Sequence, residues 1–167
     1  MLSPNNFFIN LLNHYNSDLI ENIKIMETLN NSKIARLATV DPANKQPYIV
    51  PVVFVFDGNN IFIPIDDKPK KTMNSDQLKR VKNIQKNHNI SFLIDTYDDN
   101  DWNNLAYLMI QGKAGIVNVV NDKDTIKKAH FLLSEKYAQY KKQVVEMGDT
   151  CIVIDIQKTI SWKYSPN

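Results

Sequence analysis

Apolar residues recur along this chain at two different spacings, and the spacing changes near residue 32. Before that point they follow the repeat of three to four residues that is typical of amphipathic helices. A first helix can open at Ser3 and Pro4, and its apolar face is Phe8, Leu11, Leu12 and Tyr15. A second helix carries Ile20, Ile23, Met26 and Leu29 on one face. We expect both helices to pack on a core, and the alternative is an arm that reaches a second subunit.

After residue 32 the pattern changes to short runs rich in β-branched and aromatic residues, which predict strands. Six runs stand out: 33–40, 47–56, 61–65, 89–97, 105–120 and 150–162. The run 47–56 is almost wholly apolar and predicts a strand covered on both faces. The sequence DGNN at 57–60 predicts a hairpin, and Asn44 is our candidate for a left-handed turn residue. The run 105–120 is expected to bend at Gly112 or Gly115.

Two further helices are predicted between these strands. Asn74 and Gln77 resemble a capping pair, and they precede a helix with Leu78, Val81 and Ile84 on its buried face. Another helix starts near Asp122 and is expected to continue through Val145. Its inward residues are predicted to be Ile126, Ala129, Leu132, Leu133 and Tyr137.

The predicted fold class is mainly β (α+β), a six-stranded antiparallel split barrel with peripheral helices. Strands and helices do not alternate one for one, which argues against a doubly wound parallel sheet. A chain of 167 residues predicts one domain. Within it, residues 1–31 are the helical N-terminal segment, and residues 32–167 are the barrel with its inserted helices.

Composition narrows the function classes. The chain is 43% hydrophobic and 23% charged with a formal net charge of +2, as expected for a soluble globular protein. Cys151 is the only cysteine, so no disulfide can form within the chain. No apolar run resembles a signal peptide or reaches the length of a membrane span, so we expect a cytoplasmic protein. Four glycines are too few and too scattered for a GxGxxG fingerprint or a P-loop.

The most suggestive stretch is IDDKPKKT, where Lys68, Lys70 and Lys71 surround Pro69 just after a predicted strand. Thr72 adds a hydroxyl. Ammonium groups with a hydroxyl and backbone N–H groups suit a phosphate, because charge-assisted hydrogen bonds are the stronger ones. The plain alternative is a solvated turn that leads into the polar face of a helix. Further cations extend this basic run through Lys86.

Two other positions are candidates for binding. Arg36 sits in the middle of a predicted strand, where it either faces solvent or needs an anion or carboxylate partner. Trp102 lies in an acidic loop with Tyr97 before it, and such aromatic residues can stack on a ring, close a subunit interface or pin the loop. The aspartates of this loop do not have calcium-loop spacing. No histidine has metal-site spacing, and no nucleophile–base pair is recognisable.

These pieces in this order resemble the pyridoxamine-phosphate-oxidase-like split-barrel flavoproteins. The matching segments are ARLATV, QPYIVPVVFVFDG, IFIPIDDKPKKT, LKRVKNI, ISFLIDTYDDNDW and QGKAGIV, which together cover roughly residues 32–117. The chain is most similar to the subgroup described as deazaflavin (coenzyme F-420)-dependent oxidoreductases.

The resemblance implies a homodimer with two cofactor sites at its interface, and F-420 or FMN as the cofactor. It implies that the cofactor phosphate is bound by the segment carrying Asp66, Lys68, Lys70, Lys71 and Thr72, with Arg36 as a further candidate. It also implies that the strand residues Tyr48, Val50, Pro51 and Val52 run beside the ring. Trp102 or its loop is expected near the site from the other subunit.

The function expected on this basis is hydride transfer to a small-molecule substrate that the sequence does not identify. A flavin-binding or storage protein without turnover is the alternative, because it needs the same binding residues. A nucleic-acid-binding barrel is disfavoured, since the basic run has few interleaved aromatic residues. We expect neither a nucleic-acid nor a membrane partner.

Overall fold

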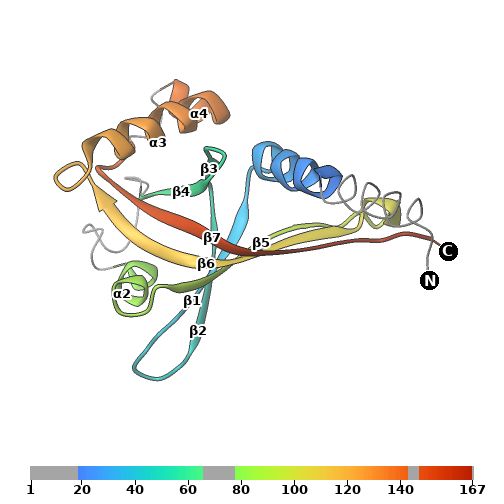
Figure 1. The fold of residues 1–167 in the computed structure, drawn as a ribbon, viewed down its shortest axis with the longest axis horizontal. Helices are drawn as coiled ribbons and strands as arrows, with labels where there is room; N and C mark the ends of the chain where they lie inside the picture. The colour runs from blue at the N-terminus through green and yellow to red at the C-terminus, as the bar shows by residue number, and fades with distance from the viewer. Residues whose placement is uncertain (1–18, 66–77, 143–146, 167) are drawn as a thin grey trace, which may run out of the picture.

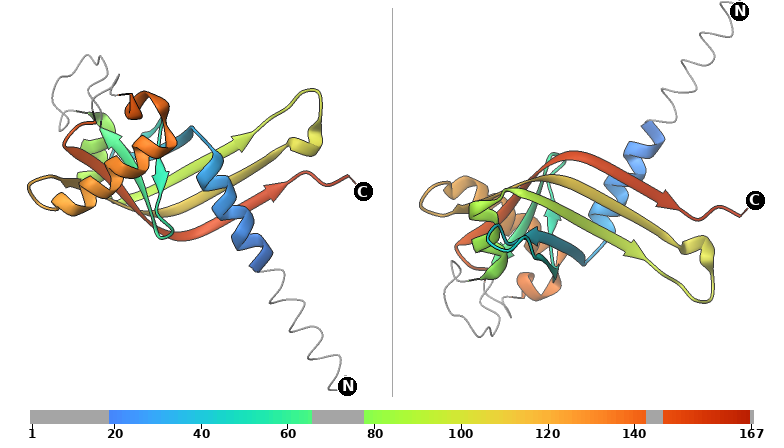
Figure 2. Two further views of the ribbon diagram at one scale, coloured as in Figure 1. Left: turned by 90° about the horizontal axis from the view of Figure 1, so that it is seen from above. Right: turned by 90° about the horizontal axis from the view of Figure 1, so that it is seen from below.

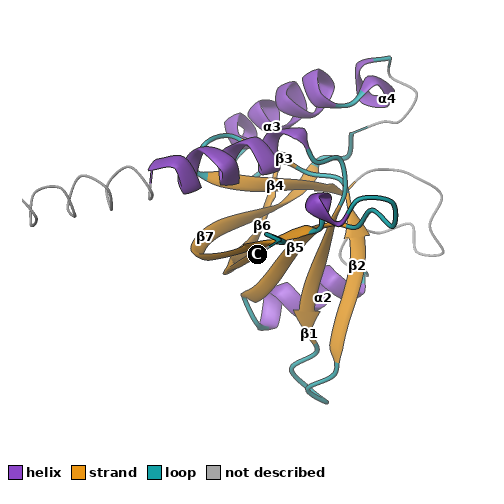
Figure 3. Ribbon diagram, turned by 90° about the vertical axis from the view of Figure 1, so that its right-hand side faces the viewer, coloured by secondary structure: helices purple, strands orange, loops and turns teal. Residues whose placement is uncertain are grey.

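The computed structural model describes residues 19–65, 78–142 and 147–166. Its centre is one seven-stranded antiparallel sheet with the order β2-β1-β5-β6-β7-β4-β3, which curves into a half-barrel (Figures 1 and 3). The strands are β1 (Ala35–Val40), β2 (Pro47–Val52), β3 (Val55–Phe56), β4 (Asn60–Ile65), β5 (Asn89–Thr96), β6 (Ala106–Asn118) and β7 (Thr150–Lys163). The predicted antiparallel split-barrel class is confirmed, with seven strands in place of six.

The additional strand arises because the predicted strand 47–56 is broken at Phe54. The hydroxyl of Tyr137 donates to the carbonyl oxygen of Phe54 at 2.7 Å and accepts from its N–H at 3.0 Å. These two backbone groups are therefore satisfied by a side chain, and the chain turns so that β3 pairs with β4. The prediction that this whole run is covered on both faces is wrong for β2, whose Pro47, Ile49 and Pro51 are exposed.

Two short loops of the sheet were predicted from turn residues in the sequence. At the predicted hairpin, Asp57 accepts from the N–H groups of Asn59 and Asn60 at 2.9 and 2.7 Å, and Gly58 has a φ of 102°. In the β1–β2 loop the left-handed residue is Lys45, with a φ of 61°, so the prediction for Asn44 is wrong by one position. The side chain of Asn44 instead accepts from the N–H of Gln46 at 3.0 Å, which closes a turn beside it.

The pairing of the long strand β6 is irregular at Gly112, one of the two positions where a bend was expected. The register between β6 and β7 shifts between Gln111 and Gly112. A Cβ at Gly112 would lie 2.3 Å from the carbonyl oxygen of Asp155, so only glycine fits this close approach of two backbones. At Gly115 the equivalent position is open.

Two hydrophobic clusters hold the helices to the sheet. Helix α2 (Lys79–Lys86) buries Val81 and Ile84 inside the half-barrel, as predicted. Helix α3 (Lys123–Lys136) buries Ile126, Ala129 and Leu133 in a second cluster with Val55, Phe62 and Cys151. In Figure 1, α3 lies above the sheet and α2 below it. The predicted residues Leu132 and Tyr137 are partly buried.

The predicted helix from residue 122 to Val145 is not continuous. Tyr137 has an extended backbone, with φ −124° and ψ 116°, and separates α3 from the short α4 (Ala138–Lys141). This break lets the Tyr137 hydroxyl reach Phe54. The end of the predicted helix, residues 143–145, lies outside the described residues, as do the capping candidates Asn74 and Gln77.

Residues 19–31 form a helix that lies across one side of the extended β5–β7 strands (Figure 2). Leu29 is buried, Ile25 packs against the core, and Glu21 accepts from the hydroxyl of Ser161 at 2.8 Å. The predicted inward residues Ile20, Ile23 and Met26 are 52, 47 and 47% exposed, so that prediction is wrong for three of its four positions. The helix has a second apolar stripe, which is turned away from the barrel. The first predicted helix lies outside the described residues.

Candidate functional site

Strand β2 carries four of the predicted cofactor residues and divides them between two faces. Tyr48, Val50 and Val52 lie opposite Thr39, Leu37 and Ala35 of β1, whose side chains are buried. Pro51 lies opposite Arg36 on the outer face. Since β2 is the last strand at its end of the described sheet, one side of its backbone is not used by the ladder. This side offers carbonyl oxygens to a ligand, whereas Pro47 and Pro51 have no N–H, so Ile49 is the main backbone donor there.

Arg36 projects from β1 to the outer face of the sheet, where its guanidinium forms an ion pair with Asp95 of β5. The two side chains are 47 and 39% exposed. The solvent-facing alternative for Arg36 is therefore confirmed, and a carboxylate of the same chain pairs with it. Arg36 and Pro51 are brought together, while Tyr48, Val50 and Val52 lie on the opposite face.

The predicted phosphate-binding residues Asp66, Lys68, Lys70, Lys71 and Thr72 lie outside the described residues. The described chain places the two ends of their segment. Strand β4 ends at Ile65, which pairs with Thr150, and the chain is described again from Leu78, directly before α2.

Trp102 lies at the opposite end of the sheet from Ile65. It begins the short 3₁₀ helix η2 (Trp102–Asn104), is 55% exposed and meets the ring of Tyr164 edge to face at 6.3 Å. Ile65 pairs with the first residue of β7 and Ala106 with the last. Thirteen steps along a strand correspond to roughly 40 Å. Trp102 and the end of β4 are therefore not parts of one pocket within a single chain.

A shallow hollow of about 460 Å³ lies near the end of β5, the start of β6 and the end of β7. Its aromatic lining is Tyr97, Tyr107 and Trp162, and Asp95 adds a carboxylate. The rings of Tyr107 and Trp162 stack with centroids 6.0 Å apart and planes inclined by 22°. Sequence reasoning missed this pair, because only the register between β6 and β7 places the two residues opposite each other.

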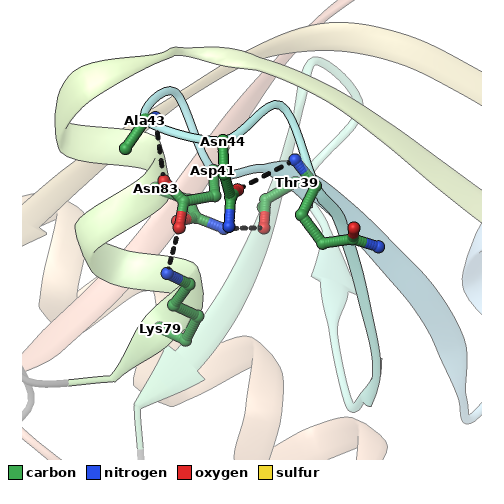
Figure 4. A network of polar contacts seen from close by, with 7 residues as sticks. Thr39, Asp41, Ala43, Asn44, Lys79 and Asn83 are labelled. Carbon is green, nitrogen blue, oxygen red and sulfur yellow. Dashed lines mark hydrogen bonds and ion pairs between the residues drawn. The ribbon is translucent and has the colours of Figure 1, made fainter.

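A polar network joins α2 to the end of β1 (Figure 4). Asn83 donates to the hydroxyl of Thr39 at 3.0 Å, and Lys79 forms an ion pair with Asp41. The hydrogen bond from Lys79, followed by that from the N–H of Ala43, lowers the pKa of Asp41. Asn83 belongs to the segment LKRVKNI that we noted in the sequence, but nothing in that segment indicated that it is buried.

Two further features of the described chain are its thiol and the arrangement of its potential metal ligands. Burial raises the pKa of the Cys151 thiol to about 12, so it is protonated at neutral pH. Within the described ranges, no three His, Cys, Asp or Glu side chains gather where they could hold a metal ion. The same part of the chain contains no helix long and apolar enough to cross a membrane.

Comparisons with known proteins identify the class of protein to which this half-barrel fold belongs. The family model described as pyridoxamine 5'-phosphate oxidase matches residues 22–163. The chain therefore belongs to the pyridoxamine 5'-phosphate oxidase family. No protein of curated function matches the sequence.

Solved structures share the fold at low sequence identity. A conserved hypothetical protein, Rv2991, from Mycobacterium tuberculosis is 20% identical with a TM-score of 0.65, over 84% of this chain and 83% of that one. A FAD-binding protein from Mesorhizobium loti is 16% identical with a TM-score of 0.60, over 86 and 94% of the two chains. HutZ, the heme storage protein from Vibrio cholerae, is 15% identical with a TM-score of 0.62, over 84 and 92%.

Proposed function

We propose that this protein binds FMN or F-420 and transfers a hydride between that cofactor and a small organic substrate. The family match over residues 22–163 carries the proposal. The similarity of fold to a FAD-binding protein supports it. A cofactor of this kind supplies the redox chemistry, and the protein supplies binding, orientation and exclusion of water. Such a role does not require a dedicated acid–base residue.

The proposed cofactor site extends from β2 to the segment that follows β4. Lys68, Lys70, Lys71 and Thr72 bind the phosphate, and Asp66 begins this segment. The ring lies along β2 beside Tyr48, Val50, Pro51 and Val52. The free side of the β2 backbone supports this placement, because it can hydrogen-bond the polar edge of a flavin ring.

The site is completed by a second copy of the chain, so the protein works as a homodimer. The separation of Trp102 from the end of β4 supports this arrangement, since only another subunit can bring Trp102 to the phosphate-binding end. Exposed apolar side chains on the described surface also support it. They include Ile20, Ile23 and Met26 on the first helix and Ile49, Tyr107 and Trp162 on the sheet.

Sedimentation velocity tests the dimer. We expect the wild type to sediment as a dimer and the Ile49→Lys variant to dissociate at lower concentration. Ile49 is 63% exposed, so the lysine does not disturb the core. A matched variant, Phe131→Lys, changes an equally exposed residue on α3 and should leave the dimer intact. A monomeric wild type at all concentrations contradicts the homodimer.

The choice between the two cofactors depends on the basic run. Lys82 and Lys86 are exposed on α2, where they can meet the long anionic tail of F-420. FMN has no such tail and needs only the segment from Lys68 to Thr72. A protein specific for F-420 therefore binds it more tightly than FMN, and its affinity falls steeply with added salt.

A second candidate is a cofactor-binding or storage protein that does not catalyse a reaction. The similarity of fold to HutZ supports this alternative. Reduction assays with a panel of small electrophilic substrates separate it from an oxidoreductase. The cytoplasmic location stays a prediction from the sequence.

The experiment that tests the proposed function is a visible absorption spectrum of the purified protein, followed by titration with FMN and with F-420. We expect one cofactor to bind with saturable spectral change and fluorescence quenching. If neither cofactor binds, the proposed function is wrong.

A further inference from the structure

The hollow at the end of the sheet has walls made largely of aromatic rings. Tyr97, Tyr107 and Trp162 line it, and their side chains are 64, 38 and 44% exposed. Asp95 adds a carboxylate to the lining. The volume of about 460 Å³ lies in the range of small-molecule sites. Clustered aromatic surface of this kind, left open to water, is typical of a binding site.

The register of the sheet places the lining side chains on one face. Asp95 lies opposite Tyr107, and Tyr107 lies opposite Trp162. Ser161 is the neighbour of Trp162 and therefore points to the other face, where its hydroxyl donates to the helix at residues 19–31. This helix crosses the strands on that other side (Figure 2). It does not cover the hollow.

The aromatic walls favour a planar ligand that carries a positive charge. The rings of Tyr107 and Trp162 are inclined by only 22°, with centroids 6.0 Å apart, so they present neighbouring π faces. These faces carry partial negative charge, and a flat ring stacks on them. A cation over such a face is attracted electrostatically, most strongly by tryptophan and next by tyrosine.

The charged groups around the hollow also favour a cation. Asp95 pairs with Arg36, so these two charges compensate each other. The hydroxyl of Tyr97 donates to Asp99 at 2.9 Å, which places a further carboxylate at the tip of a lining side chain. Lys163 comes directly after the lining tryptophan on β7 and projects from the opposite face. The charge that these groups leave uncompensated at the hollow is therefore negative.

The hollow lies close to the proposed position of the cofactor ring. Pro51 of β2 lies opposite Arg36 of β1, and Arg36 reaches Asp95 in the wall of the hollow. Only β1 separates β2 from β5, so the two strands are roughly 10 Å apart. A ligand in the hollow is thus a near neighbour of a ring held along β2.

We propose that this hollow is the substrate site and that the substrate is a planar heteroaromatic cation. The role as substrate rests on the proposed function, whereas the binding rests on the hollow alone. Addition of a hydride, with its electron pair, to a ring carbon of such a cation gives a neutral dihydro ring, and the reduced cofactor is the hydride donor. The product then lacks the charge that attracted the substrate, which favours its release.

The test uses N-methylquinolinium as the probe and two reference compounds. Quinoline has the same two rings and is uncharged at neutral pH, while tetramethylammonium has the charge without a ring. In equilibrium dialysis with the purified wild type, we expect N-methylquinolinium to bind saturably and about tenfold more tightly than either reference compound. Equal affinity for quinoline would overturn the choice of a cation. Equal affinity for tetramethylammonium would overturn the choice of a planar ring.

Variants locate the probe in the hollow. Tyr107→Leu and Trp162→Leu remove a π face and keep an apolar side chain, so each should reduce the preference for N-methylquinolinium over quinoline by about threefold or more. Asp95→Asn leaves Arg36 uncompensated and should weaken N-methylquinolinium binding without weakening FMN binding. The matched control is Phe131→Leu, which removes a 66% exposed ring on α3 and should bind all three probes as the wild type does. An unchanged preference in both ring variants overturns the inference.

The outcomes separate this inference from the proposed function. If N-methylquinolinium does not bind saturably, as when a second subunit fills the hollow, the inference is wrong even though FMN or F-420 binds. If N-methylquinolinium binds as expected and neither cofactor does, the proposed function is wrong. The role of the ligand as substrate then falls with it, and the hollow remains a binding site for planar cations.

Discussion

Arg36 on β1 and Asp95 on β5 form an ion pair across the outer face of the sheet. Both side chains are partly exposed, so the pair is expected to contribute less than about 1 kcal/mol to stability. Its greater effect is on charge, because the carboxylate already neutralises Arg36.

The first prediction follows from this neutralisation. Arg36→Gln should weaken FMN or F-420 binding far less than replacement of Lys68, Lys70 and Lys71. Asp95→Asn should not weaken it, because the variant leaves Arg36 free to attract a phosphate. Both variants should change the free energy of unfolding in urea by less than about 1 kcal/mol. A large loss of cofactor affinity in Arg36→Gln would instead place this guanidinium at the phosphate.

Tyr137 joins the end of α3 to the break between β2 and β3. Its hydroxyl satisfies the N–H and carbonyl of Phe54 and also lies 3.0 Å from the carbonyl oxygen of Lys33. Tyr137→Phe should therefore lower the free energy of unfolding by about 1–3 kcal/mol, because it leaves buried backbone groups without a partner. Tyr107→Phe is the control, since Tyr107 is partly exposed. This variant should change the free energy of unfolding by less than about 0.5 kcal/mol. Equal effects of the two variants in urea denaturation would refute this role of Tyr137.

The glycines of β6 provide a matched pair. Gly112→Ala should destabilise the protein by about 1–3 kcal/mol, because the new methyl group meets the backbone of β7. Gly115→Ala places the same group in open space and should be neutral or slightly stabilising. Thermal denaturation of both variants checks this. Similar thermal midpoints for the two variants would show that the β6 and β7 backbones at Gly112 can separate at little cost in free energy.

Lys136 gives a prediction about pH. Burial and, secondarily, the charge of Lys33 lower its pKa from 10.5 to about 8. Its Nζ lies 3.9 Å from the centre of the Phe54 ring and donates to the carbonyl oxygen of Leu29 at 2.9 Å. Between these two pKa values the unfolded chain binds more protons than the folded chain, so this residue makes stability rise with pH.

The measurement is urea denaturation of the wild type and Lys136→Met from pH 7.5 to 9.5. This range lies below the titration of Tyr137, whose pKa burial raises to about 12. The free energy of unfolding of the wild type should rise relative to that of the variant across the range. Lys127→Met, at an exposed position on α3, should run parallel to the wild type. A constant difference between wild type and Lys136→Met would mean that Lys136 titrates alike in both states.

Much of the fold could be predicted because strands and helices leave a local pattern. The alternation of Ile90, Phe92 and Ile94 identified β5, and the spacing of Val81 and Ile84 identified the buried face of α2. The helix at residues 19–31 was harder, since it has two apolar stripes. Only contact with the barrel decides that Ile25 and Leu29 face inward.

The long-range contacts of the fold and of the candidate site were less accessible to sequence reasoning, because they join residues far apart in the chain. Nothing near Phe54 indicates that Tyr137 will break its strand. Nothing near Asn83 indicates a partner at Thr39, 44 positions away. The proposed relation between Trp102 and the segment from Lys68 to Thr72 requires a second subunit, which no local pattern encodes.

The most direct measurement of the central claim is titration of FMN and F-420 into the wild type and into a variant with Lys68, Lys70 and Lys71 all changed to Gln. The three ammonium groups are proposed to hold the phosphate, and hydrogen bonds to charged groups are the stronger kind. Their combined loss should therefore weaken binding by at least about a hundredfold. The variant should keep the thermal midpoint of the ligand-free wild type. Unchanged cofactor affinity in a folded variant would contradict the account.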